Sequence, residues 1–246
     1  MKRPEWRKCL LILLLLLKAG PAAGDDLRLF GEMSQQEFRA LSEDLSAIAS
    51  HRILSSAQPV ASGRIRTDVQ FSQTRLANPD AWEAATGSSR RAVAAARLGI
   101  TLGLPADLEL AGFHAQMPGS NVRKSGLELR RVLHDGAGQG FSVQLRGGLS
   151  VLGGVEDFDF RTRQADLLLS RPLGDFNAYF AVGRIWTRSE HEGEHQLLPA
   201  GLDTERFAQY RGVVGLWRAF GPFELGGEYT RLGSTDNLAL RAALRF

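Results

Sequence analysis

From residue 63 to the C-terminus, apolar and polar side chains alternate along the chain in short segments. In residues 141–152, for example, Phe141, Val143 and Leu145 alternate with polar or charged neighbours. A period of two is typical of β-strands that have one apolar and one polar face. Each segment is near the length that a tilted strand needs to cross the hydrocarbon core of a membrane. Ten segments show the pattern: 63–74, 91–104, 108–117, 125–133, 141–152, 158–171, 176–188, 207–219, 223–232 and 237–246.

The connections between these segments also alternate. Short ones fall at 105–107, 135–140, 172–175 and 221–222, and the others fall at 75–90, 118–124, 153–157, 189–206 and 233–236. Antiparallel membrane barrels have short periplasmic turns, longer outer loops and an even number of strands. The sequence therefore predicts an all-β, antiparallel up-and-down transmembrane β-barrel of about ten strands, with a soluble β-sandwich as the alternative. Eight or twelve strands stay open, because alternation slips near 111–112 and 162–164, where a bulge would switch faces, and Arg131 falls on an apolar face.

Aromatic residues gather at both ends of the predicted strands, as the two interfaces of a membrane require. The inner girdle is expected at Phe141, Phe176, Trp217, Phe220, Phe223 and Phe246, and the outer one at Phe158, Phe160, Trp186, Phe207, Tyr210 and Tyr229.

The last strand carries a more specific pattern. Leu240, Leu244 and Phe246 share one face, and the chain given ends on that phenylalanine. This resembles the C-terminal assembly signal of bacterial outer-membrane barrels, with Leu244 and Phe246 as its end. Together with the strand pattern, it makes the chain similar to the small Gram-negative outer-membrane β-barrel proteins of the porin-like superfamily. The resemblance implies outer-membrane lipid and the barrel-assembly machinery as partners.

The N-terminus has the order of a secretory signal peptide. Basic residues within 1–8 precede an unbroken leucine and isoleucine run at 10–17, and small residues follow up to Gly24. The apolar run is too short for a membrane-spanning helix, which needs about 20 residues. We therefore expect 1–24 to be a signal peptide cleaved after Gly24, with a retained anchor helix as the alternative, and the mature protein to lie in the cell outer membrane.

Residues 25–62 differ from the barrel segment 63–246. Ser34 is a candidate N-cap, and Phe38, Leu41, Leu45 and Ile48 recur at helical spacing. This pattern predicts a short N-terminal amphipathic helix with a linker after it. We expect residues 25–62 to form a periplasmic cap, or a plug partly inside the barrel; a partner-binding helix is the alternative.

Removal of the signal peptide changes the charge balance. Of 30 basic and 27 acidic residues, 1–24 hold five and one, so 25 basic and 26 acidic residues remain. The basic isoelectric point thus gives no reason to expect nucleic-acid binding. The single cysteine, Cys9, leaves with the signal peptide, so neither a disulfide nor a thiolate metal site is expected.

The polar faces of the predicted strands are rich in charge. Pairing across 233–236 would set Glu228 near Arg241 and Glu224 near Arg245. Buried charges must pair or stay wet. They therefore form either a mutually satisfied ladder that fills a narrow barrel or a thin polar conduit that favours anions. The residues expected to line the lumen are Arg64, Arg66, Asp68, Arg97, Glu128, Arg130, Arg146, Glu224, Glu228, Arg241 and Arg245, together with Arg163 and Asp166.

These features leave two functions open. The first is a small porin-like channel for small polar or anionic solutes. The alternative is a non-conducting structural or surface-binding barrel that acts through its extracellular loops. A channel needs a continuous wet path, whereas a surface protein needs a closed interior and the outer loops. The sequence leaves the solute and the oligomeric state open.

No catalytic constellation emerges, and no cofactor or metal site is predicted. Residues 191–195 read HEGEH and so match the HExxH motif of zinc proteases. In those proteases a helix places both histidines on one face. Here the motif has a central glycine and lies in a polar loop, so a helix is not predicted. His114 has no serine or aspartate that the expected register places beside it, and His134 with Asp135 falls at a periplasmic turn. A serine, aspartate or histidine hydrolase is therefore not expected.

Overall fold

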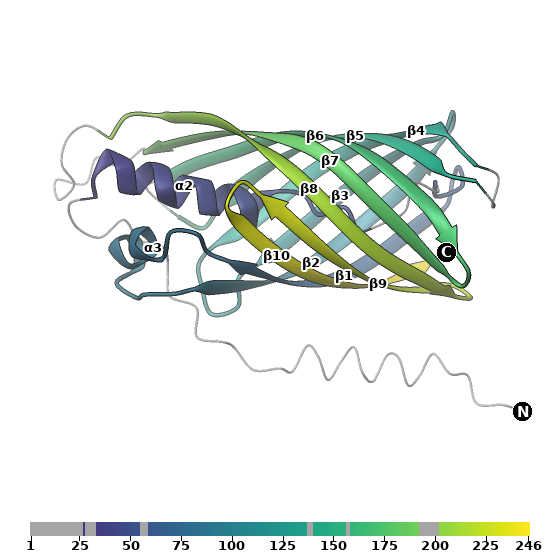
Figure 1. Ribbon diagram of the computed structural model, residues 1–246, viewed down its shortest axis with the longest axis horizontal. Coiled ribbons are helices and arrows are strands. Elements are labelled where there is room, and N and C mark those ends of the chain that lie inside the picture. The colour runs from purple at the N-terminus through teal and green to yellow at the C-terminus, as the bar shows by residue number, and fades with distance from the viewer. Residues whose placement is uncertain (1–26, 28–32, 55–58, 137–139, 156–157, 192–201) are drawn as a thin grey trace, which may run out of the picture.

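The computed structural model describes residues 27, 33–54, 59–136, 140–155, 158–191 and 202–246. Within them, ten antiparallel strands form a closed barrel in which each strand pairs with its sequence neighbours and β1 closes the ring against β10 (Figure 1). The predicted up-and-down barrel is confirmed, with ten strands. The strands are β1 (Ile65–Arg75), β2 (Ala92–Leu104), β3 (Leu108–Gln116), β4 (Arg123–His134), β5 (Ser142–Gly153), β6 (Phe158–Leu173), β7 (Phe176–His191), β8 (Glu205–Phe220), β9 (Phe223–Leu232) and β10 (Thr235–Arg245).

The two ends of the barrel differ. At the end where Phe246 lies, strands are joined by short turns such as 174–175 and 221–222; we call it the turn end (Figure 1). The opposite end, here the loop end, carries helix α3 (Pro79–Thr86) between β1 and β2. The expectation of bulges at 111–112 and 162–164 is wrong, because the strands pair there without a shift of register. Among the described ladders, the register shifts between Val132 and His134.

The outward face of the wall is apolar. Leu98, Leu127 and Leu240 expose 61%, 61% and 68% of their surface. A continuous band of such side chains fits hydrocarbon and not water. The flanking exposed aromatics are Trp186, Tyr210 and Tyr229 toward the loop end, and Phe141, Phe176, Phe220 and Phe246 at the turn end. Phe158, Phe160 and Trp217, expected in these girdles, are buried on the inner face instead.

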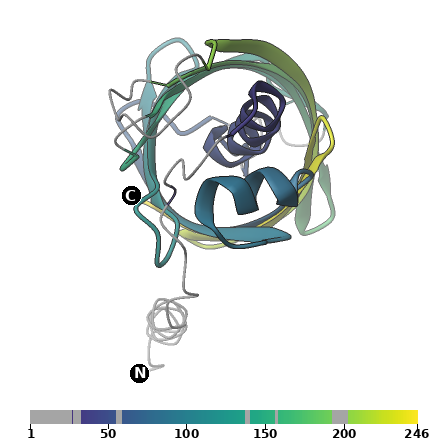
Figure 2. The same cartoon turned by 90° about the vertical axis from the view of Figure 1, so that its left-hand side faces the viewer.

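Helix α2 (Gln35–Ala49) lies inside the ring of strands at the loop end (Figures 1 and 2). Ser34 and Glu37 form a capping box: the Glu37 backbone N–H donates to the Ser34 hydroxyl, and the Ser34 N–H donates to the Glu37 carboxylate. The Ser34 backbone N–H holds the pKa of Glu37 below its usual range. In the described part of the chain, no helix is both long and apolar enough to cross a membrane.

Of the two expected positions, a periplasmic cap and a plug partly inside the barrel, α2 has the second, because it lies within the ring of strands at the loop end. Val60 lies at the other end, where its N–H bonds Glu109 at the start of β3. Helix α2 lies inside the barrel because its apolar stripe packs against α3 and the inner face of the wall. Phe38 and Leu41 are fully buried in one cluster with Trp82 of α3 and Phe160 of β6. Burying each of these side chains contributes about 1.5–3 kcal/mol.

A glycine inside the wall makes room for one lumenal side chain. A Cβ at Gly215 would lie 2.1 Å from the ring of Tyr179, which is its cross-strand partner. The Tyr179 ring therefore packs over Gly215 of β8, and its hydroxyl donates to Glu228 at 2.9 Å. Alternation along a single strand does not predict that a glycine is needed here, because the need comes from a side chain on the neighbouring strand.

Candidate functional site: the filled lumen

The inward faces of the strands carry a set of buried charges, here called the lumenal network. Seven cations and six carboxylates of the described strands belong to it, so the charges nearly balance. Its members are Arg66, Arg97, Lys124, Arg130, Arg146, Arg211 and Arg241, with Asp68, Glu109, Glu128, Asp166, Glu224 and Glu228.

Glu128 is the centre of this network. Its carboxylate accepts a bidentate pair from Arg146, at 2.9 and 2.8 Å, and a further hydrogen bond from Arg130 at 2.6 Å. The Nε2 atom of His51 lies 3.2 Å from the same carboxylate. Planar guanidinium groups match a carboxylate in this two-bond geometry. One acid is thereby held by two strands and by the N-terminal segment.

A second cluster surrounds Glu109 near the turn end. Glu109 accepts from Arg130 and Gln144, each at 3.4 Å, and Arg66 lies 4.0 Å away. Its other oxygen accepts the backbone N–H of Val60 at 2.6 Å. The end of the N-terminal segment is thus fixed to the wall shortly before β1.

The last hairpin corrects an expected pair. Glu224 pairs with Arg245, as expected, and also with Arg241 at 3.0 Å. Glu228 is instead opposite Ala239, so its expected pairing with Arg241 is wrong. The turn holds two residues, 233–234, and not four, which shifts the register by two positions.

The N-terminal segment bonds to the wall through its own backbone. Arg146 donates to the Ile53 carbonyl at 3.3 Å, and Arg241 donates to the Leu54 carbonyl at 2.8 Å. The Leu54 N–H donates to Glu228 at 2.6 Å. A chain that leaves its helix inside a barrel needs partners for its bare amides and carbonyls. The lumenal network supplies them.

Around His51 the contacts are equally dense. The His51 N–H donates to Gln164 at 2.9 Å, and Arg211 donates to the His51 carbonyl. Arg211 also forms a two-bond pair with Asp166. The imidazole lies 2.9 Å from Arg97, whose guanidinium covers the ring of Phe113 at 4.2 Å.

At the loop end the contacts of α2 are both apolar and polar. The hydroxyls of Ser42 and Ser46 lie 2.8 Å from those of Ser189 and Thr187 on β7. Asp44 accepts the backbone N–H groups of residues 77 and 78, each at 3.0 Å. Burial raises the pKa of Asp44, although these hydrogen bonds oppose the shift.

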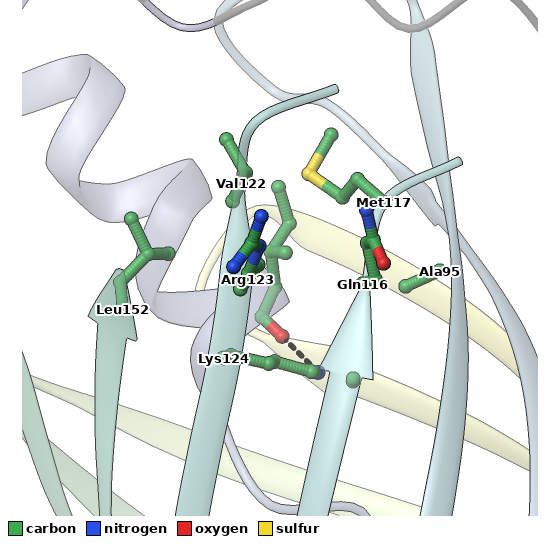
Figure 3. A pocket seen from close by; sticks show the side chains of 9 residues that line it. Ala95, Gln116, Met117, Val122, Arg123, Lys124 and Leu152 are labelled. Atoms are coloured by element: carbon green, nitrogen blue, oxygen red, sulfur yellow. Dashed lines mark hydrogen bonds between the residues drawn. The ribbon is translucent and has the colours of Figure 1, made fainter. Parts of the chain in front are cut away.

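Figure 3 shows how closely the helix end fits the wall. The Lys124 ammonium donates to the carbonyl of Ile48 in the last turn of α2, where a cation also matches the helix dipole. The cavity left between Ile48, Met117, Val122 and Leu152 is about 10 Å³, near the lower limit for one water molecule.

The expected lumen residues divide into three groups. Arg66, Asp68, Arg97, Glu128, Arg130, Arg146, Asp166, Glu224, Glu228 and Arg241 are buried and face inward. Arg245 also faces inward, but its side chain is 44% exposed at the turn end. Arg64 precedes β1 and is exposed, and Arg163 faces outward, so both expectations are wrong.

Sequence reasoning missed several members of the site. Glu109, Lys124 and Arg211 lie on inward faces, and continued alternation on β3, β4 and β8 could have identified them. His51 and Arg52 are buried in the lumen. They carry no such signal, because residues 50–54 have no regular structure.

One candidate pair was also missed. His114 Nδ1 lies 2.9 Å from the Ser125 hydroxyl, because β3 and β4 pair these two residues directly. The expectation that no serine lies beside His114 is therefore wrong. The pair faces outward. A catalytic triad also requires a carboxylate that bonds the imidazole, and none does so in the described part of the chain.

Among the described residues, no group of three metal-ligating side chains gathers. The HEGEH string begins at His191, the last residue of β7, and its other residues lie outside the described part.

No protein-family model and no curated protein sequence matches the chain. Solved structures do match. An outer-membrane channel from Pseudomonas putida F1 shares 13% identity and a TM-score of 0.50, over 80% of this chain and all of the other. The KdgM porin, in complex with disordered oligogalacturonate, shares 9% identity and a TM-score of 0.41, over 74% of this chain and 99% of the porin.

The outer-membrane protease OmpT from Escherichia coli shares 12% identity and a TM-score of 0.37, over 78% of this chain and 99% of the protease. At these identities the likeness concerns the fold. The match to the Pseudomonas putida channel, together with the ten-stranded closed ladder, shows that the chain has the fold of the outer-membrane β-barrel proteins.

Proposed function

We propose that the protein is an outer-membrane barrel that its own N-terminal segment closes, and that it acts through the structured surface at its loop end. This is the non-conducting alternative of the two functions left open by the sequence. The observation that carries it is the filling of the lumen by residues 33–54, with Val60 bonded at the turn end.

The loop end supports a surface role. Helices α2 and α3 and the ends of the strands share one apolar cluster, which includes Phe38, Trp82 and Phe158. Arg39 of α2 further bonds Glu205 of β8 at 2.9 Å and covers the ring of Phe207. Such packing holds the described part of the loop end in one shape, and a fixed surface binds a partner at a lower entropic cost than mobile loops.

A channel that opens by release of the plug is the second candidate. The observation in its favour is the polar nature of the contacts in the middle of the lumen. Release of residues 50–54 would free donors of Arg146, Arg211 and Arg241, and these would face anionic solutes. The apolar cluster of α2 opposes such release.

Single-channel conductance in a planar bilayer separates the two candidates. The protein without its signal peptide would be refolded, and folding would be checked by heat-modifiable gel migration. The closed barrel predicts silence over the whole voltage range. A second variant that lacks residues 25–54 should then conduct, which would show that the barrel itself can form a pore.

Steady conductance steps from the intact, folded protein would contradict closure. Voltage-dependent openings that disappear when α2 is cross-linked to β7 would favour the gated channel. The expectation that the protein is not an enzyme stays a prediction. A test with a lipid ester substrate and a Ser125→Ala variant would check the outward His114–Ser125 pair.

A further inference from the structure

Five arginines face outward near the loop end of β6, β7 and β8. We call them the arginine patch. The ladders place Arg161 opposite Arg188 and Arg188 opposite Arg206, so three of them form a row across three strands. The members of the patch are Arg161, Arg163, Arg184, Arg188 and Arg206, all exposed.

Like charges directly opposite each other destabilise a sheet unless an anion lies between them. Two carboxylates partly offset the patch: Asp159 lies 2.7 Å from Arg161, and Glu190 lies 2.5 Å from Arg188. Arg163 and Arg206 contact no acidic side chain within the described residues. Among the described residues, the patch therefore keeps an excess of positive charge.

The level of the patch on the wall is informative. Arg184 contacts the exposed rings of Trp186 and Tyr210 at 5.5 and 5.3 Å, and such aromatic residues mark a membrane interface. Nearer the turn end, the same outward faces carry apolar side chains such as Leu167 and Val182. The patch thus begins where hydrocarbon ends, which is the depth of lipid headgroups.

The wall is also hollowed here. A hollow of about 630 Å³ is lined by four of the five arginines, by Trp186 and by Thr187 and Phe207 of the same strands. Arginine is the side chain best suited to bind phosphate through two parallel hydrogen bonds. A headgroup with phosphates could thus contact several guanidinium groups at once, with its acyl chains along the apolar wall below.

We propose that the arginine patch binds a phosphorylated lipid headgroup of the outer leaflet. The inference rests on the placement of the barrel in the outer membrane proposed above, and it is independent of whether the lumen conducts. It goes beyond a general lipid contact, because it assigns one sector of the wall and one chemical group.

Native mass spectrometry of the folded protein in detergent micelles tests the proposal. The probes are lipid A with two phosphates, the same lipid without phosphates, and inorganic phosphate. The intact protein should bind the phosphorylated lipid in preference to the other two. An Arg163→Gln, Arg206→Gln variant should bind it about tenfold more weakly or worse, since it loses charged hydrogen bonds.

Arg231→Gln is the matched control, because Arg231 faces outward on β9 outside the hollow and pairs with Asp236 at 3.1 Å. It should leave binding unchanged. Equal binding by the patch variant, equal loss in the control, or equal binding of the lipid without phosphates would overturn the proposal. Displacement of the lipid by millimolar inorganic phosphate would also overturn it, because it would indicate a general anion site. Heat-modifiable migration of each variant separates these outcomes from failure to fold.

Discussion

The docking of α2 inside the barrel depends on a few apolar side chains, and Leu41 is the sharpest one to remove. Leu41 is fully buried in the cluster that joins α2, α3 and the strand ends. Truncation of a buried leucine to alanine costs about 2–5 kcal/mol. Because the strand ladder does not include α2, we expect most of this cost to fall on the docked state of the helix.

The free-energy cost of this truncation sets how much the undocked fraction of α2 should rise. Each 1.4 kcal/mol changes an equilibrium tenfold, so a loss of about 3 kcal/mol raises the undocked fraction of α2 about 100-fold. Ser42 faces β7 and is fully buried, and residues 25–246 contain no cysteine. A Ser42→Cys substitution therefore introduces a single thiol that reports on undocking.

The rate at which a soluble maleimide labels this thiol is the assay. Leu41→Ala should raise the labelling rate about 100-fold, in proportion to the undocked fraction. Gln36→Ala is the matched control on the exposed face of the same helix and should leave the rate unchanged. An unchanged rate in the Leu41→Ala variant, with the barrel still folded, would refute the argument that this packing holds the plug.

Three further predictions concern the lumenal network, helix α2 and the last strand. Glu128→Gln removes the buried carboxylate that Arg146 and Arg130 share, although Arg130 keeps Glu109, and should lower the free energy of unfolding by about 3–5 kcal/mol, measured by urea titration in liposomes; an unchanged urea midpoint would be inconsistent with a buried, paired Glu128. The pKa of Asp44 is raised by burial, so its contribution is present below the unfolded pKa, about 4, and is lost as pH rises through the folded one. Asp44→Asn should flatten the decline in urea midpoint as pH rises above about 4, and an equal slope in both proteins would disprove this origin. Deletion of Phe246, which also donates its N–H to Ile65, should reduce the yield of inserted barrel in proteoliposomes with assembly machinery, whereas Leu240→Ala should not; equal yields would argue against an assembly signal.

Much of the fold could be predicted from the sequence because alternation is a local property. The period of two gives the strand positions and their inward faces, and it placed Arg97, Glu128 and Arg146 in the lumen correctly. The helix was also predictable, since Ser34 and Glu37 are three residues apart, as a capping box requires.

What could not be predicted depends on contacts between distant segments. The predicted pairing of Glu228 with Arg241 was wrong because the turn that sets the register has two residues and not four. The neighbours His114 and Ser125 become visible only once that register is known for β3 and β4. The path of residues 50–54 carries no periodic signal, because their backbone is held by the wall and not by regular structure.

Occupation of the lumen by residues 33–54 is tested most directly by a cross-link. The hydroxyl oxygens of Ser46 and Thr187 lie 2.8 Å apart, so a Ser46→Cys, Thr187→Cys pair should form a disulfide between α2 and β7 in the oxidising periplasm. Mass spectrometry of the protein from isolated outer membranes would measure this bond. Nearly complete disulfide formation is the predicted result. Two free thiols that react with a soluble maleimide in the folded barrel would contradict closure of the lumen by the N-terminal segment.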